Sequence, residues 1–113
     1  MDDKYLFYGM TGNKMCFNHI LLNALDLANE KIEAKIIFEG ESVKLVSVFE
    51  EEKNALYLKA KERGLIAGIC LACSKVMGVF EKNSTYGLPM LGDMSGHAGM
   101  KPFITDGYQV ISM

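Results

Sequence analysis

The apolar residues of the chain change their spacing several times, and each change predicts a different element of secondary structure. Residues 4–9 form a short apolar run with three aromatic side chains, which indicates a buried strand leading into a glycine-rich turn. In the next segment the apolar positions follow the spacing of one helix face, with Thr11 or Asn13 as the cap. These positions are Phe17, Ile20, Leu21, Ala24, Leu25 and Ala28.

The rest of the chain continues to alternate between strand-like and helix-like spacing. The nearly continuous apolar run in residues 33–39 suits a strand of a sheet that is covered on both faces. The later predicted elements are a helical region over 44–64 that Gly64 ends, a strand over 65–70, a helical pattern from Ala72 through Val76 to Phe80, a glycine-rich connection over 86–99, a brief helix over 102–106 and a strand over 108–113. This order is typical of βαβ units on a parallel sheet with right-handed crossovers, in one domain that spans residues 1–113.

Composition and charge narrow the function classes. Half of the residues are hydrophobic, a slight surplus for 113 residues, which favours a homo-oligomer with some of that surplus at a subunit interface. The net charge is −2 and no basic run occurs, so nucleic acid is not an expected partner. The apolar runs are too short to span a membrane, and residues 1–4 lack a signal pattern, so we expect a cytoplasmic protein.

In open α/β sheets, ligands bind beyond the carboxyl ends of the strands, and three segments of this chain map to that edge. The first contains the motif Cys70-Leu71-Ala72-Cys73, where a strand runs into a helix. A helix N-terminus stabilises a thiolate, and Ser74 and Lys75 add a hydroxyl and a cation. The pattern favours a nucleophilic, persulfide-carrying or redox cysteine, while the alternative is a pair of small apolar core residues.

The cysteines also raise the question of metal binding. Three cysteines without an export signal argue against a disulfide framework, so the thiols should be reduced. Cys70 and Cys73 would supply half of a tetrahedral zinc site, which would need Cys16, His19, His97 or a second subunit to complete it. The spacing does not require such a site, and we predict neither a metal nor another cofactor.

The second segment at this edge is the turn over residues 9–14. It is too short for a nucleotide-binding P-loop, and Met15 stands where that motif needs Ser or Thr. It could still present backbone N–H groups to a small anion, or it is an ordinary strand-to-helix turn. The ligand-binding candidates here are Gly9, Thr11, Gly12 and Asn13.

The third segment, residues 92–101, combines glycines with a histidine, a hydroxyl, a carboxylate and a lysine. His97 could exchange a proton with a nearby thiol, and Ser95 and Gly96 join Ser74 as candidate ligand-binding residues. The alternative is a capping segment in which Ser95 or Asp93 caps the last helix.

The run from Ile69 to Val79 resembles the strand-to-helix segment of the DsrE/TusD-like sulfur-relay proteins, in which an apolar residue and a cysteine close a strand. The resemblance implies a three-layer α/β/α sandwich with a mainly parallel sheet of four to five strands. It also implies that Cys70 carries a persulfide between a sulfur donor and an acceptor protein. Cys73 is additional to that pattern and could resolve the persulfide into a disulfide.

Two further interpretations stay open at this point. The first is a non-catalytic oligomeric module of the same fold that binds a small ligand or a protein at the same edge. The second is a thioredoxin-like oxidoreductase, although Ile69 and Leu71-Ala72 do not match the aromatic residue and the proline-containing pair typical of that motif.

Overall fold

The computed structural model describes residues 3–113 and has a five-stranded sheet in the order β4-β3-β2-β1-β5, in which every pair of neighbouring strands is parallel. The elements are β1 (Lys4–Gly9), α1 (Lys14–Asn29), β2 (Glu33–Phe38), the 3-10 helix η1 (Gly40–Lys44), α2 (Leu45–Glu52), α3 (Ala55–Glu62), β3 (Ile66–Cys70), α4 (Leu71–Val76), α5 (Phe80–Asn83), β4 (Met90–Leu91), α6 (Lys101–Thr105) and β5 (Tyr108–Ser112).

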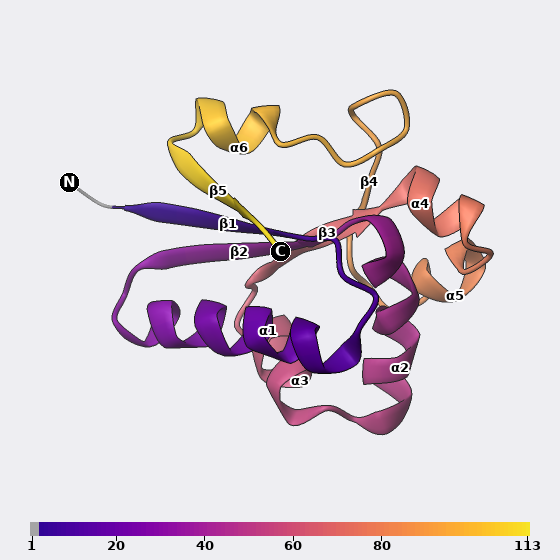
Figure 1. Cartoon of the computed structure of the whole chain (residues 1–113), viewed down its shortest axis with the longest axis horizontal. Helices are drawn as coiled ribbons and strands as arrows, with labels where there is room; N and C mark the ends of the chain where they lie inside the picture. The colour runs from indigo at the N-terminus through magenta and orange to yellow at the C-terminus, as the bar shows by residue number, and fades with distance from the viewer. Residues whose placement is uncertain (1–2) are drawn as a thin grey trace.

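Helices cover both faces of the sheet, so the predicted three-layer α/β/α architecture is confirmed. Figure 1 shows α1, α2 and α3 below the sheet and α6 above it, with α4 and α5 at one end. The strand order explains this division, because β1, β2, β3 and β4 follow one another across the sheet while β5 lies on the other side of β1. The layer above the sheet is thin, since it consists of α6 and the loop that precedes it.

Local side-chain chemistry sets the ends of the helices. The Asn13 side chain accepts a hydrogen bond of 2.9 Å from the Cys16 N–H and caps α1, as the sequence predicts. The helical region predicted over residues 44–64 is wrong as one element, because Lys53 adopts a left-handed conformation and Asn54 caps a new helix. The helical pattern after Cys70 is interrupted in the same way, at Gly78 with a φ of 72°.

The core lies mainly between the sheet and α1–α3, where four buried aromatic rings meet. Phe17 stacks on Phe38 with ring centroids 4.4 Å apart, and Phe49 and Tyr57 pack around this pair. The helix face predicted for α1 is the buried one from Phe17 to Leu25. This packing fixes β1 and β2 side by side and thereby positions the residues at their carboxyl ends.

Substituting Gly9 by alanine should destabilise the fold by about 1–3 kcal/mol. A methyl group there would lie 2.6 Å from Cε2 of Phe17, whose ring cannot retreat because it is stacked on Phe38. Urea denaturation followed by circular dichroism measures the loss. An unfolding midpoint equal to that of the wild type would show that this part of the core accepts the added volume.

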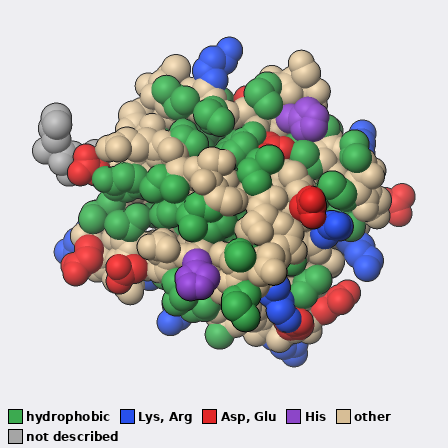
Figure 2. Space-filling view, in the orientation of Figure 1, with side chains coloured by type: hydrophobic (Ala, Val, Ile, Leu, Met, Phe, Trp, Pro, Cys, Tyr) green, Lys and Arg blue, Asp and Glu red, His purple; other side chains and the backbone are tan. Residues whose placement is uncertain are grey.

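Apolar side chains also reach the surface, most visibly where β5 forms an edge of the sheet. Figure 2 shows hydrophobic side chains gathered over β1, β2 and β5, and the exposed large ones near this edge include Ile104, Ile111 and Met113. The predicted homo-oligomer stays a prediction. Within residues 3–113, no helix has both the length and the apolar character needed to cross a membrane.

Candidate functional site

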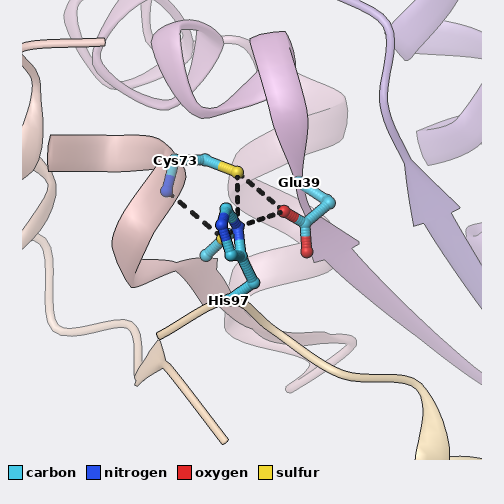
Figure 3. A group of neighbouring side chains, drawn as sticks. Glu39, Cys73 and His97 are labelled. Atoms are coloured by element: carbon cyan, nitrogen blue, oxygen red, sulfur yellow. Dashed lines mark hydrogen bonds and ion pairs between the residues drawn. The ribbon is translucent and has the colours of Figure 1, made fainter. Parts of the chain in front are cut away.

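The side chains that carry chemistry meet at the carboxyl ends of the neighbouring strands β2 and β3. Glu39 directly follows β2, Cys70 is the last residue of β3, and Cys73 lies in the first turn of α4. His97 reaches the same point from the loop that precedes α6, so four segments of the chain meet there (Figure 3). One sulfur, nitrogen or oxygen atom from each of these four residues lies within 4.8 Å of the corresponding atoms of the others. We refer to Glu39, Cys70, Cys73 and His97 as the four-residue cluster.

The histidine ring faces both thiols and the carboxylate through one nitrogen. His97 Nδ1 lies 3.4 Å from Cys70 Sγ, 3.4 Å from Cys73 Sγ and 3.7 Å from Glu39 Oε1. The Cys73 thiol donates a hydrogen bond of 2.7 Å to Glu39 Oε1. The donor atoms of the cluster therefore point toward a shared centre, as the dashed contacts in Figure 3 show for the residues labelled there.

Backbone contacts hold the cysteines and the histidine in place. Cys70 is the N-cap of α4, and its sulfur accepts a hydrogen bond of 3.4 Å from the Cys73 N–H. The Gly96 carbonyl accepts a 2.9 Å hydrogen bond from the Ala72 N–H, which ties the histidine loop to the start of the helix. Gly96 has a φ of 92°, a conformation that favours glycine, and this tight turn aims His97 at the thiols.

Tyr8 supports the carboxylate from the neighbouring strand β1. Its hydroxyl oxygen lies 2.7 Å from Glu39 Oε2 and 2.7 Å from the Ala98 carbonyl oxygen. Glu39 is buried, with only 4 % of its surface exposed, so this contact and the thiol contact orient the two carboxylate oxygens. Hydrogen-bonded partners of this kind fix the direction in which a carboxylate presents its free electron pairs.

The ionisation of the thiols corrects one expectation from the sequence. Burial and the adjacent Glu39 carboxylate raise the pKa of Cys70, and the same two causes raise the pKa of Cys73 to about 12. Burial also raises the pKa of Glu39, but hydrogen bonds from Cys70, Cys73 and Tyr8 outweigh it and lower that pKa below its usual range. This direction is opposite to the thiolate expected at the helix N-terminus, because burial and the Glu39 carboxylate both disfavour the charged form of the thiols.

Ser74 and Ser95 lie outside the cluster. The buried Ser74 hydroxyl donates to the Cys70 carbonyl oxygen and accepts from the Asn83 amide, so its contacts stabilise the local fold, and its ligand-binding role stays a prediction. Ser95 is exposed in the histidine loop, where its φ of 50° helps form the turn. Among the predicted ligand-binding residues, His97 enters the cluster directly and Gly96 positions it.

The turn after β1 is occupied by contacts within the chain. The N–H groups of Met10 and Thr11 donate to the Met113 carbonyl oxygen, and the Asn13 N–H donates to the Thr11 hydroxyl. The N–H groups of Met10, Thr11 and Asn13 are thus engaged within the chain, and the ligand-binding role considered for Gly9, Thr11, Gly12 and Asn13 stays a prediction. Gly9 has a positioning role, since its carbonyl accepts a 2.9 Å hydrogen bond from the Glu39 N–H.

The spacing of the cluster can be compared with the geometry of a tetrahedral metal site. Zinc–sulfur bonds of about 2.3 Å and zinc–nitrogen or zinc–oxygen bonds of about 2.0–2.2 Å place neighbouring donor atoms roughly 3.3–3.8 Å apart. The two sulfur–nitrogen separations of 3.4 Å and the nitrogen–oxygen separation of 3.7 Å fall in this range. The sulfur–oxygen separation of 2.7 Å is shorter, as expected for a thiol that donates a proton to a carboxylate.

Fold and site together define an all-parallel α/β domain with a Cys-Cys-His-Glu cluster at the carboxyl edge of its sheet. Over 110 residues the chain is 29% identical to "Uncharacterized protein MJ0733" of Methanocaldococcus jannaschii, an alignment that covers 95% of this chain and 88% of that protein. No protein-family model and no solved structure matches the chain. The resemblance to the DsrE/TusD-like proteins stays a prediction.

Proposed function

We propose that the chain is a metal-binding protein and that the four-residue cluster holds one zinc ion. The observation that carries this proposal is the convergence of two sulfur atoms, one imidazole nitrogen and one carboxylate oxygen at separations close to those of a tetrahedral site. Thiolate ligands favour zinc over magnesium, calcium or manganese, which prefer sites made of oxygen atoms.

The electrostatics of the cluster support the same proposal. Without a metal, both thiols hold their protons next to a buried carboxylate. A zinc ion replaces these protons, and two thiolates with one carboxylate leave the site with one net negative charge. The side chain of His97 is 42% exposed, which provides a route from solvent to an otherwise enclosed site.

The direct test is the metal content of the purified, reduced protein after removal of its metals and addition of zinc. We expect one zinc per chain by native mass spectrometry, and cobalt in its place should give the visible absorption of a tetrahedral ion with thiolate ligands. Cys70→Ser and Cys73→Ser should lose this signal, whereas Cys16→Ser should keep it because that exposed thiol lies on α1, outside the cluster. Equal zinc binding by all three variants would overturn the proposal.

Tyr8→Phe should weaken zinc binding roughly 10–100-fold, which is the usual effect of losing a hydrogen bond to a metal ligand. The phenol contacts Glu39 Oε2, and its removal leaves that buried carboxylate free to turn away from the shared centre. Competition with a chelator measures the change in affinity. Tyr108→Phe is the matched control, because that hydroxyl bonds to Glu33 and not to a residue of the cluster.

Sulfur carriage is the second candidate function, and the position of His97 Nδ1 3.4 Å from Cys70 Sγ favours it. Because Cys70 has no exposed surface, this function requires a local opening that exposes its sulfur to the donor. A proton acceptor there would assist Cys70 in taking sulfane sulfur from a donor persulfide, giving Cys70–S–SH and the donor thiol. The carrier would then pass the outer sulfur to the thiol of an acceptor protein. Mass spectrometry after treatment of metal-free protein with a persulfide donor tests this, and an equal gain of sulfur by Cys70→Ser would contradict the assignment to Cys70.

A further inference from the structure

We propose that Cys73 is the oxidation site of this centre, and that a disulfide to Cys70 releases the bound metal. The inference rests on the proposed zinc site and names a regulation of it. The co-reactant is hydrogen peroxide or another two-electron oxidant of that class.

Access from solvent determines which sulfur reacts first. Cys70 has no exposed surface, whereas Cys73 keeps 9% of its surface exposed. The most exposed side chain of the cluster is that of His97, whose Nδ1 lies 3.4 Å from both sulfur atoms, so the exposed surface of Cys73 is what distinguishes the two cysteines. A small oxidant that enters beside His97 therefore meets Cys73 before Cys70.

The reaction proceeds in two steps that balance. The Cys73 thiolate attacks one oxygen of peroxide, the O–O bond breaks, and Cys73 sulfenic acid and hydroxide form. The Cys70 thiolate then attacks the Cys73 sulfur and expels a second hydroxide as the disulfide forms. The two sulfur atoms together lose two electrons, and the two peroxide oxygens gain them.

The geometry allows this second step without a rearrangement of the fold. The two sulfur atoms lie within 4.8 Å of each other, and a disulfide bond is about 2.05 Å long. The sulfur atoms must therefore move closer together by less than about 3 Å. Cys70 caps the helix in whose first turn Cys73 lies, so rotation of the two side chains supplies this approach.

Oxidation removes half of the ligand set in one event. The disulfide sulfurs no longer carry the negative charge that binds zinc, and only His97 and Glu39 remain from the cluster. Two ligands do not complete the tetrahedral site, so the ion leaves. A thiol reductant restores both cysteines and hence the site.

The experiment uses the zinc-loaded Cys16→Ser protein, which keeps only the two cysteines of the cluster. One equivalent of peroxide should release one equivalent of zinc to a metallochromic indicator. The mass of the chain should then be two units below that of the metal-free, reduced chain. Dimedone added during the reaction should label Cys73, located by fragmentation of the peptide that contains both cysteines. Dithiothreitol, followed by its removal and fresh zinc, should restore full occupancy.

Different results would overturn the zinc site and the release of zinc by a disulfide. A protein that takes up no zinc at the start overturns the zinc site itself. A protein that binds zinc and keeps it after the disulfide has formed overturns the release, and so does one in which excess peroxide forms no disulfide. Dimedone found on Cys70 and not on Cys73 overturns the assignment of the first attack.

Discussion

Zinc should raise the thermal unfolding midpoint of the metal-free protein by about 12–16 °C when its free concentration is about a thousand times the dissociation constant. A ligand that binds only the folded state stabilises it by about 4 kcal/mol at that ratio. For a domain of this size each kcal/mol shifts the midpoint by roughly 3–4 °C. Differential scanning calorimetry with and without zinc measures the shift.

The ligands make this effect specific to the cluster. Glu39, the Cys70–Cys73 turn and His97 are far apart in the sequence, so the unfolded chain has no preformed site. A bound ion would also offset the charge of the buried Glu39 carboxylate. The shift should persist in Cys16→Ser and disappear in Cys73→Ser. A shift of the same size in Cys73→Ser would mean that zinc stabilises the protein from another place.

Much of the fold follows from the sequence because the periodic segments are long and the helix caps are recognisable. The apolar face of α1 and its Asn13 cap needed no tertiary information. The break between α2 and α3 was missed because a left-handed lysine has no distinctive signal in the sequence. The strand β4 was missed because two residues inside a glycine-rich connection show no periodicity, and only pairing with β3 makes them a strand.

Three of the four residues of the cluster could be predicted from the sequence, and Glu39 could not. Cysteine and histidine are conspicuous residue types at a predicted strand end and in a glycine-rich loop, so Cys70, Cys73 and His97 could be found. Glutamate is a common residue type, so Glu39 does not stand out in the sequence. It joins the cluster because Phe38 pairs with Ile69, which places the following residues Glu39 and Cys70 side by side. The position of Glu39 directly after an apolar strand indicates a residue at the carboxyl edge of the sheet. It identifies Glu39 as a partner of Cys70 only once the order of the strands is known.

The ionisation of the thiols shows how tertiary structure can reverse a local rule. A helix N-terminus favours a thiolate by an amount that corresponds to about one kcal/mol. Burial and the Glu39 carboxylate act in the opposite direction and are stronger here, since they raise the pKa of Cys73 to about 12. The sequence contains the helix start but does not show that a carboxylate from another strand faces it.

Zinc affinity should rise about 100-fold for each pH unit between pH 7 and pH 9. Binding requires both thiolates and therefore releases two protons, and each proton released contributes a factor of ten per pH unit. If the thiols had ordinary pKa values near 9, the rise of zinc affinity with pH would become less steep at about pH 9, because thiols that are already ionised release no proton. Because the pKa values of Cys70 and Cys73 are raised, the steep dependence should continue beyond that point. Titration against a chelator of known pH dependence measures it.

The stability of the metal-free protein should change with pH in the opposite direction. A thiol whose pKa is higher in the folded than in the unfolded state stabilises the fold fully below about pH 9, and that contribution is lost as the pH rises toward the folded pKa of about 12. The gap between the unfolding midpoints with and without zinc should therefore widen from pH 7 to pH 9.5. Cys16→Ser should show the same widening, because its cluster is intact. A gap that stays constant with pH would show that zinc does not replace the thiol protons, and the cysteines would then not be its ligands.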